Sequence, residues 1–88
     1  MHPVVVITRD TAIPMLRSLV CVLVTSTFHH HVAEVEVGPD EGLDHDCAAN
    51  CDNLFTLPRA VLAHRRGELG PAKRQQLDAA LMIALGLA

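Results

Sequence analysis

Two apolar runs near the N-terminus constrain the fold more than any other feature of this sequence. Val4 to Ile7 and Leu19 to Val24 are uninterrupted apolar stretches, rich in the β-branched side chains that favour an extended backbone. Both are too short for independent helices, so we expect buried strands, the first continuing to Thr8 and buried on both faces, the second central in a sheet. Polar residues flank the two runs, with His2 before the first and Thr25 after the second. The pattern predicts a hydrophobic scaffold with a site at its strand ends.

A third strand, a turn and a fourth strand are expected in the middle of the chain. Apolar and acidic residues alternate up to Val37, the period of a half-exposed strand, which predicts that Glu34 and Glu36 face solvent. Gly38 to Gly42 is a turn by composition, with two glycines that can adopt positive φ. Cys47 to Phe55 predicts a more polar strand, whose polar side chains need hydrogen-bonding partners.

Two helices are expected in the last third of the chain. Thr56 can cap a short helix over Pro58 to Ala63, since proline is tolerated in the first turn. A longer helix opens at Gly70-Pro71 and stops at Gly86. We expect it to pack on the sheet through an apolar stripe with helical spacing, formed by Leu77, Leu81, Ala84 and Leu85. The sequence therefore predicts one domain over residues 1–88, of mainly β architecture with helices (α+β).

Size and composition exclude several classes of protein. A chain of 88 residues buries a modest core, which favours oligomerisation, and its 50% hydrophobic content excludes disorder. No apolar stretch reaches the roughly 18 to 20 residues that a bilayer requires, so we expect no membrane association. The odd number of cysteines, 3, fits a reduced, cytoplasmic protein. The net charge of −3 argues against an unspecialised nucleic-acid coat, so any RNA site must be local.

Four stretches carry a recognisable pattern of residues in a fixed order. The first is similar to Arg-Pro-Val-x-Val-Ile-Ser-x-Asp and the second to an apolar strand ending in Thr-Ser; the four are His2 to Asp10, Val22 to Ser26, Gly42 to Thr56, and Gly67 to Leu87. Together they resemble the MazF/PemK family of toxin endoribonucleases. Two features differ from that family. The arginine before the proline is His2 here, and family members usually begin with a further strand and a loop that cover the site.

The resemblance implies a small SH3-like barrel of the MazF/CcdB type with a C-terminal amphipathic helix. It implies a homodimer that cuts single-stranded RNA at short sequences without metal or other cofactor, and that a cognate MazE-like antitoxin silences. In such cleavage the 2′-hydroxyl is the nucleophile, so the expected products are a 2′,3′-cyclic phosphate and a 5′-hydroxyl.

The resemblance assigns the catalytic chemistry to His2 and Thr25. An arginine would stabilise charge on the phosphate through a fixed fork of donors, which His2 cannot copy. His2 can instead exchange protons at physiological pH, and Thr25 can donate a hydrogen bond to the scissile phosphate. The alternatives are a surface histidine without a role, and a strand-end hydroxyl that bonds its own backbone.

Further RNA-binding side chains are expected around these two residues. Ser26 and Thr27 can contact bases or phosphates, and Asn53 can read a base edge or belong to a structural network or dimer interface. Arg9 and Arg17 are expected to track phosphates from strand ends that frame the site. The remaining basic pairs, Arg65-Arg66 and Lys73-Arg74, are interpreted as solvated charges.

We expect no metal site. His29 to His31 are adjacent in an extended segment and point alternately to opposite faces, which favours a solvated or RNA-facing loop. Cys47 and Cys51 lack a matching second pair and fall on one face of a strand, which favours core packing. Two rival functions remain open: a catalytically impaired module that dimerises and binds antitoxin or RNA, and a gyrase poison of the CcdB type, which shares the fold.

Overall fold

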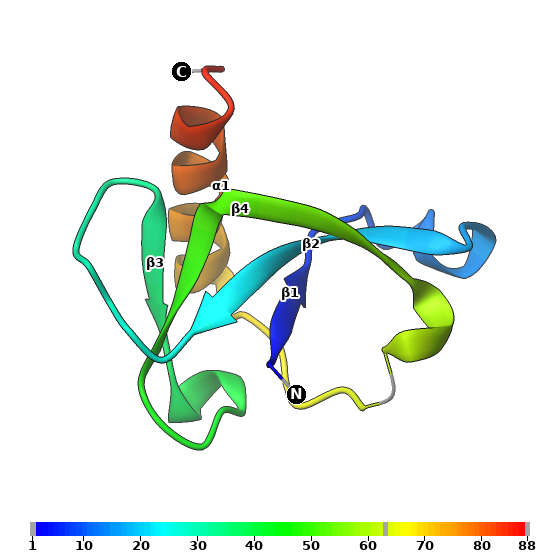
Figure 1. Ribbon diagram of the computed structural model, residues 1–88, viewed down its shortest axis with the longest axis horizontal. Coiled ribbons are helices and arrows are strands. Elements are labelled where there is room, and N and C mark those ends of the chain that lie inside the picture. Colours follow the sequence, from blue (N-terminus) through cyan, green and yellow to red (C-terminus); the bar gives the residue numbers. More distant parts are fainter. Residues whose placement is uncertain (1, 63, 88) are drawn as a thin grey trace.

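An antiparallel sheet and one C-terminal α-helix make up the computed structural model, which describes residues 2–62 and 64–87. Within these residues the sheet has four strands in the order β1-β2-β4-β3. β4 arches along its length, and α1 lies behind β3 and β4 (Figure 1). The predicted α+β class is confirmed; the elements are β1 (Val4–Val6), β2 (Ser18–Thr25), β3 (Glu34–Val37), β4 (Cys47–Pro58) and α1 (Pro71–Ala84).

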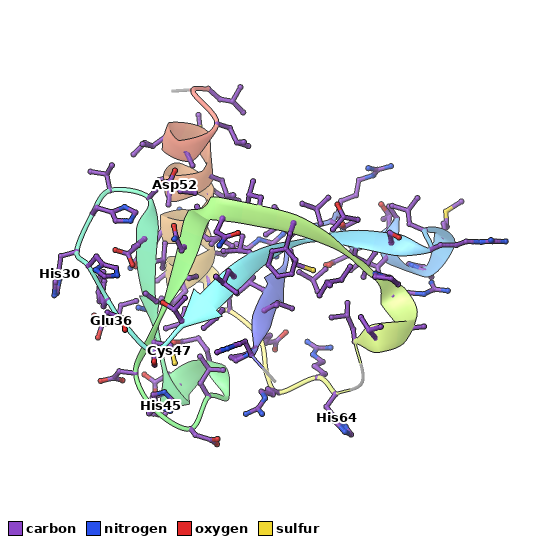
Figure 2. All side chains as sticks on the ribbon, viewed as in Figure 1. His30, Glu36, His45, Cys47, Asp52 and His64 are labelled. Atoms are coloured by element: carbon purple, nitrogen blue, oxygen red, sulfur yellow. The ribbon has the colours of Figure 1, made fainter. Side chains whose placement is uncertain are left out.

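The two long central strands, β2 and β4, carry the curvature of the sheet. Thr25 at the end of β2 pairs with Ala48 near the start of β4, but the register shifts after Val22, where Cys51 to Asn53 have no partner on β2. Such a bulge bends the strand that carries it and increases its twist. β4 accordingly turns near Asp52, as Figure 2 shows. The prediction of a central second strand is confirmed, and β4 runs beyond its predicted end.

The hydrophobic core lies between the sheet and α1. Leu77 and Ala80 of α1 are buried in it, and both Cys47 and Cys51 are buried as predicted. Leu85, predicted to join the stripe, is 54% exposed because it follows the last residue of α1, whose final turns extend past the sheet (Figure 1). None of the helices in residues 2–62 and 64–87 has the length and apolar character needed to cross a bilayer.

β1 is shorter and more exposed than predicted. It contains only Val4–Val6, and these side chains are half-buried rather than buried on both faces. The reason is its position at the edge of the sheet, where it pairs with β2 alone. Val4 lies opposite Leu23, so His2 precedes β1 beside the point where β2 ends.

Glu34 is buried, contrary to the prediction, whereas Glu36 faces solvent as predicted. One carboxylate oxygen of Glu34, Oε1, accepts hydrogen bonds from the backbone N–H groups of His29 (3.0 Å) and His31 (3.4 Å). The same oxygen lies 3.3 Å from Nε2 of His31. A charged group is stable at such a buried position only with partners of this kind. Glu34 therefore holds the loop that follows Thr25.

The short helix predicted over Pro58 to Ala63 is wrong. Thr56 pairs with Val20 in the sheet and does not cap a helix. β4 continues to Pro58, because its ladder with β2 extends that far, and a single 3-10 turn over Arg59–Val61 follows. Ala63, the predicted end of the helix, lies outside the described residues.

Candidate active site

A hollow of about 270 Å³ lies where β1 begins and β2 ends. Because the two strands are antiparallel, the start of β1 and the end of β2 lie at the same end of the sheet. His2 and Thr25, the two residues predicted to be catalytic, both line this hollow. The other lining residues are Pro3, Val24, Ser26, Leu43, Asp44, His45, Cys47 and Arg66.

The predicted RNA-binding residues lie in separate parts of the structure. Ser26 lines the hollow, but Arg9 and Arg17 lie at the opposite end of the β1–β2 pair. Arg17 directly precedes β2, whose 8 residues correspond to roughly 26 Å along the strand. These two arginines therefore do not frame the hollow as expected. Asn53 is exposed in the bulged part of β4 and does not line it either.

The Thr25 side chain is half-buried and bonded locally. Its hydroxyl donates to the backbone carbonyl of Thr27 at 2.9 Å, the local bond that was the alternative to a catalytic role. A hydroxyl has one proton and two acceptor lone pairs, and its proton is redirected by rotation about a single bond. Thr25 can therefore exchange the Thr27 carbonyl for an acceptor in the hollow.

Arg66 reaches the hollow from the segment that precedes α1, which passes beside the N-terminus in Figure 1. Its Nη1 lies 3.7 Å from Oδ2 of Asp44, and the two side chains are 50% and 87% exposed. Such an exposed pair contributes little stability. The backbone is held more firmly: Gly42 has a φ of 92°, and an added Cβ there would lie 2.2 Å from the Arg66 carbonyl oxygen. A Cβ on Gly67 would lie 2.3 Å from the Glu41 carbonyl oxygen.

His45 and Cys47 approach the hollow from the start of β4 (Figure 2). The Cys47 thiol donates to the His45 carbonyl oxygen at 3.4 Å. Burial, and then the charges of Asp46 and Asp44, raise the pKa of the Cys47 thiol. Cys47 is therefore protonated at neutral pH and does not supply a nucleophile. The His45 side chain is exposed at the hollow.

The sequence-based prediction of the site omits Asp44, His45 and Arg66. The sequence holds a signal for the first two, since Asp44 and His45 lie three and two residues before β4, whose first residues pair with the end of β2. For Arg66 the sequence pattern favours a solvated charge, whereas the structure places it at the hollow. Its signal was the glycine beside it, Gly67, because a residue without a side chain permits close contact with another backbone segment.

The histidine triplet belongs to the loop structure. The rings of Phe28 and His30 stack with centroids 4.3 Å apart, and Nδ1 of His31 accepts a hydrogen bond from the Ala33 amide at 3.2 Å. Across residues 2–62 and 64–87, no three His, Cys, Asp or Glu side chains are grouped as metal ligands.

The hollow thus combines two hydroxyls, two imidazoles, a guanidinium and a carboxylate. Imidazoles can accept and donate protons near neutral pH, and hydroxyl and guanidinium groups can donate hydrogen bonds to an anionic group. This set of groups suits reactions at a phosphodiester.

The sequence is similar to that of known toxins. The family described as "PemK-like, MazF-like toxin of type II toxin-antitoxin system" matches residues 1–85. The chain is 34% identical over 86 residues to the probable endoribonuclease MazF2 of Mycobacterium tuberculosis, covering 97% of this chain and 84% of the relative. It is 33% identical to the probable endoribonuclease MazF5 of the same species, over 96% of this chain and 78% of the relative.

Solved structures show the same fold. The Mycobacterium tuberculosis toxin MazF-mt6 superimposes with a TM-score of 0.94 at 29% identity, over 99% of this chain and 88% of the other. A mycobacterial endoribonuclease in complex with its cognate antitoxin superimposes with a TM-score of 0.87 at 29% identity, over 99% of this chain and 82% of the other. The chain therefore belongs to the PemK-like, MazF-like family of toxins of type II toxin–antitoxin systems.

Proposed function

We propose that this protein is the endoribonuclease toxin of a toxin–antitoxin pair, cutting single-stranded RNA at short sequences without a metal ion. The observation that carries the proposal is that the antiparallel pairing of β1 and β2 presents His2 and Thr25 to one hollow. Relatives named as probable endoribonucleases, similar over nearly the whole chain, support it.

The residues at the hollow supply the steps of a transphosphorylation. The RNA 2′-hydroxyl attacks phosphorus, the bond to the 5′-oxygen breaks, and the products are a 2′,3′-cyclic phosphate and a 5′-hydroxyl. One imidazole accepts the proton of the 2′-hydroxyl and a second donates a proton to the departing 5′-oxygen, roles available to His2 and His45. Thr25 donates a hydrogen bond to a non-bridging phosphate oxygen as negative charge accumulates there.

The partners follow from the same proposal. The toxin forms a homodimer in the cytoplasm, where its three free cysteines stay reduced. A cognate MazE-like antitoxin silences it; one solved relative is described as being in complex with its cognate antitoxin. An acidic antitoxin segment and an RNA phosphate backbone carry the same sign of charge, so both can compete for one site.

Incubation of the purified protein with a long RNA in EDTA tests the proposal. The expected result is cleavage that leaves 5′-hydroxyl ends, labelled by a 5′-kinase without prior phosphatase treatment, and 2′,3′-cyclic phosphate ends. His2→Ala should slow this cleavage. Uncut RNA together with retained RNA or antitoxin binding would identify the impaired binding module instead. A change in DNA supercoiling by gyrase, without RNA cleavage, would identify the gyrase poison.

A further inference from the structure

We propose that Arg66 binds the scissile phosphate and supplies the positive charge that the site needs during cleavage. This inference rests on the proposed ribonuclease function. Attack by the 2′-hydroxyl places additional negative charge on the phosphate oxygens, and fixed donors or cations at that point lower the barrier. Among the described residues that line the hollow, Arg66 alone carries a permanent positive charge.

The two arginines in the N-terminal half of the chain lie too far from the hollow to bind the same phosphate. Arg9 and Arg17 lie at the far end of the β1–β2 pair, the length of β2 away from Thr25. His2 replaces an arginine of the family pattern with a group that is charged only when protonated. The guanidinium that the family pattern places beside the proline is therefore supplied here by Arg66, from a different segment of the chain.

The backbone around Arg66 fixes the origin of its side chain. The Arg66 carbonyl oxygen packs so closely on Gly42 that a Cβ there would lie 2.2 Å away. The next residue, Gly67, makes an equally close approach to the Glu41 carbonyl oxygen. Because Gly42 and Gly67 have no side chains, the backbone at Arg66 packs directly against the turn. The same turn leads into Leu43 and Asp44, which line the hollow.

The side chain of Arg66 makes a loose, exposed contact with Asp44 at the hollow. Its distance of 3.7 Å to the Asp44 carboxylate exceeds hydrogen-bond length, so its donors remain available. A guanidinium has five N–H donors in a planar fork and binds phosphate in a bidentate manner. The exposed contact with Asp44 is weak, so an RNA phosphate can replace Asp44 as the partner of the guanidinium.

The adjacent arginine provides a matched control. Arg65 has the same charge and comes from the same segment, but it does not line the hollow. Its Nη2 lies 2.9 Å from Glu68 Oε2, and both side chains are more than three-quarters exposed, at 76% and 78%. A general loss of positive charge would affect Arg65→Gln and Arg66→Gln equally.

The test compares single-turnover cleavage of one RNA by the parent, Arg66→Gln, Arg66→Lys and Arg65→Gln. Loss of a donor to the transition state lowers the rate about 100- to 1,000-fold, so we expect that loss for Arg66→Gln. Arg65→Gln should stay close to the parent, and Arg66→Lys should recover part of the rate because it restores charge without the fork. Equal rates for the two glutamine variants, both folded by urea titration, would overturn the proposal for Arg66.

Two measurements together separate this inference from the ribonuclease function. One is cleavage of RNA, and the other is binding of an RNA that cannot be cut because it has a 2′-deoxy nucleotide at the cleavage position. If the parent cuts RNA but Arg66→Gln behaves as Arg65→Gln, the function stands and the role of Arg66 fails. If the parent neither cuts nor binds RNA, both fail. A specific phosphate contact should lower the slope of log affinity against log salt by about 0.7 in Arg66→Gln. Asp44→Asn should tighten binding more in the parent than in the Arg66→Gln background, because it removes a negative charge from the hollow and also frees Arg66. Equal tightening in the two backgrounds would also refute the proposal.

Discussion

Replacing Gly67 by alanine tests whether the backbone contact behind Arg66 positions the site. The new Cβ would lie 2.3 Å from the Glu41 carbonyl oxygen, and real Cβ atoms do not approach closer than 3.0 Å, so the two segments must separate by at least about 0.7 Å. The obstacle is backbone, which cannot move aside as a flexible side chain does. Misplacement of a site residue by about 1 Å can lower a rate roughly 100-fold. We expect Gly67→Ala to slow RNA cleavage by about 10- to 100-fold.

The same strain should lower stability by a limited amount. Overpacking of this kind costs about 1 to 3 kcal/mol, which in a domain of this size lowers Tm by about 4 to 8 °C per kcal/mol. Single-turnover cleavage and urea unfolding, measured on the same preparations, separate the loss of rate from the loss of folded protein.

Gly70→Ala is the matched control for this variant. An added Cβ at Gly70 meets nothing within 4 Å, and its φ of −71° suits any residue. We expect its stability to stay within about 0.5 kcal/mol of the parent and its cleavage rate to be unchanged. In an Arg66→Gln background, Gly67→Ala should add little, because both changes act on the same contact. A folded Gly67→Ala protein that cuts RNA as fast as Gly70→Ala would refute the reasoning.

Three further predictions concern the hydroxyl, the core and a buried thiol. Thr25→Val should slow single-turnover cleavage about 100- to 1,000-fold and Thr25→Ser should restore most of it, since serine keeps the hydroxyl; equal rates for the two variants would exclude a hydrogen-bonding role. Leu77→Ala should lower the free energy of unfolding by about 2 to 5 kcal/mol, because this side chain is 3% exposed between α1 and the sheet. Ile83→Ala, at a position that is 47% exposed, should lower it far less, and urea titration of the two variants compares the losses. Burial, followed by the charge of Asp52, raises the pKa of Cys51 from 9.0 to about 11. The unfolded chain therefore loses this proton first, and stability should fall as pH rises from 9.0 to about 11, with a shallower fall in Cys51→Ala.

The sequence predicts the central strands and the long helix because burial there follows a simple periodicity. β2 and α1 are each specified by an apolar pattern, and the antiparallel pairing of β1 with β2 then brings His2 beside Thr25. The same reasoning places β1 in the interior, because apolar content does not distinguish an edge strand from a central one. Glu34 is misplaced for a related reason: alternation predicts which face it is on, but not that a loop folds over that face and donates hydrogen bonds to it.

The parts of the site that sequence patterns do not predict depend on contacts between distant segments. Arg66 meets the turn at Gly42 through a close approach of two backbones, which leaves no periodic signal. Arg9 and Arg17 illustrate the opposite error, since they flank predicted strands yet lie at the end of the sheet away from the hollow. A strand has two ends, and only its pairing register decides which end faces the site.

Placing charge and proton transfer on separate segments has a consequence for how this site works. A guanidinium remains charged throughout the accessible pH range, whereas an imidazole accepts and releases protons within it. In a site with an arginine beside the proline, one residue next to β1 would hold the phosphate. Here the group next to β1 is His2, and the permanent charge comes from Arg66, before α1. Contact with the phosphate and movement of protons are thus assigned to different residues, so substitution of Arg66 should weaken RNA binding as well as slow cleavage, whereas substitution of His2 should slow cleavage of RNA that is still bound.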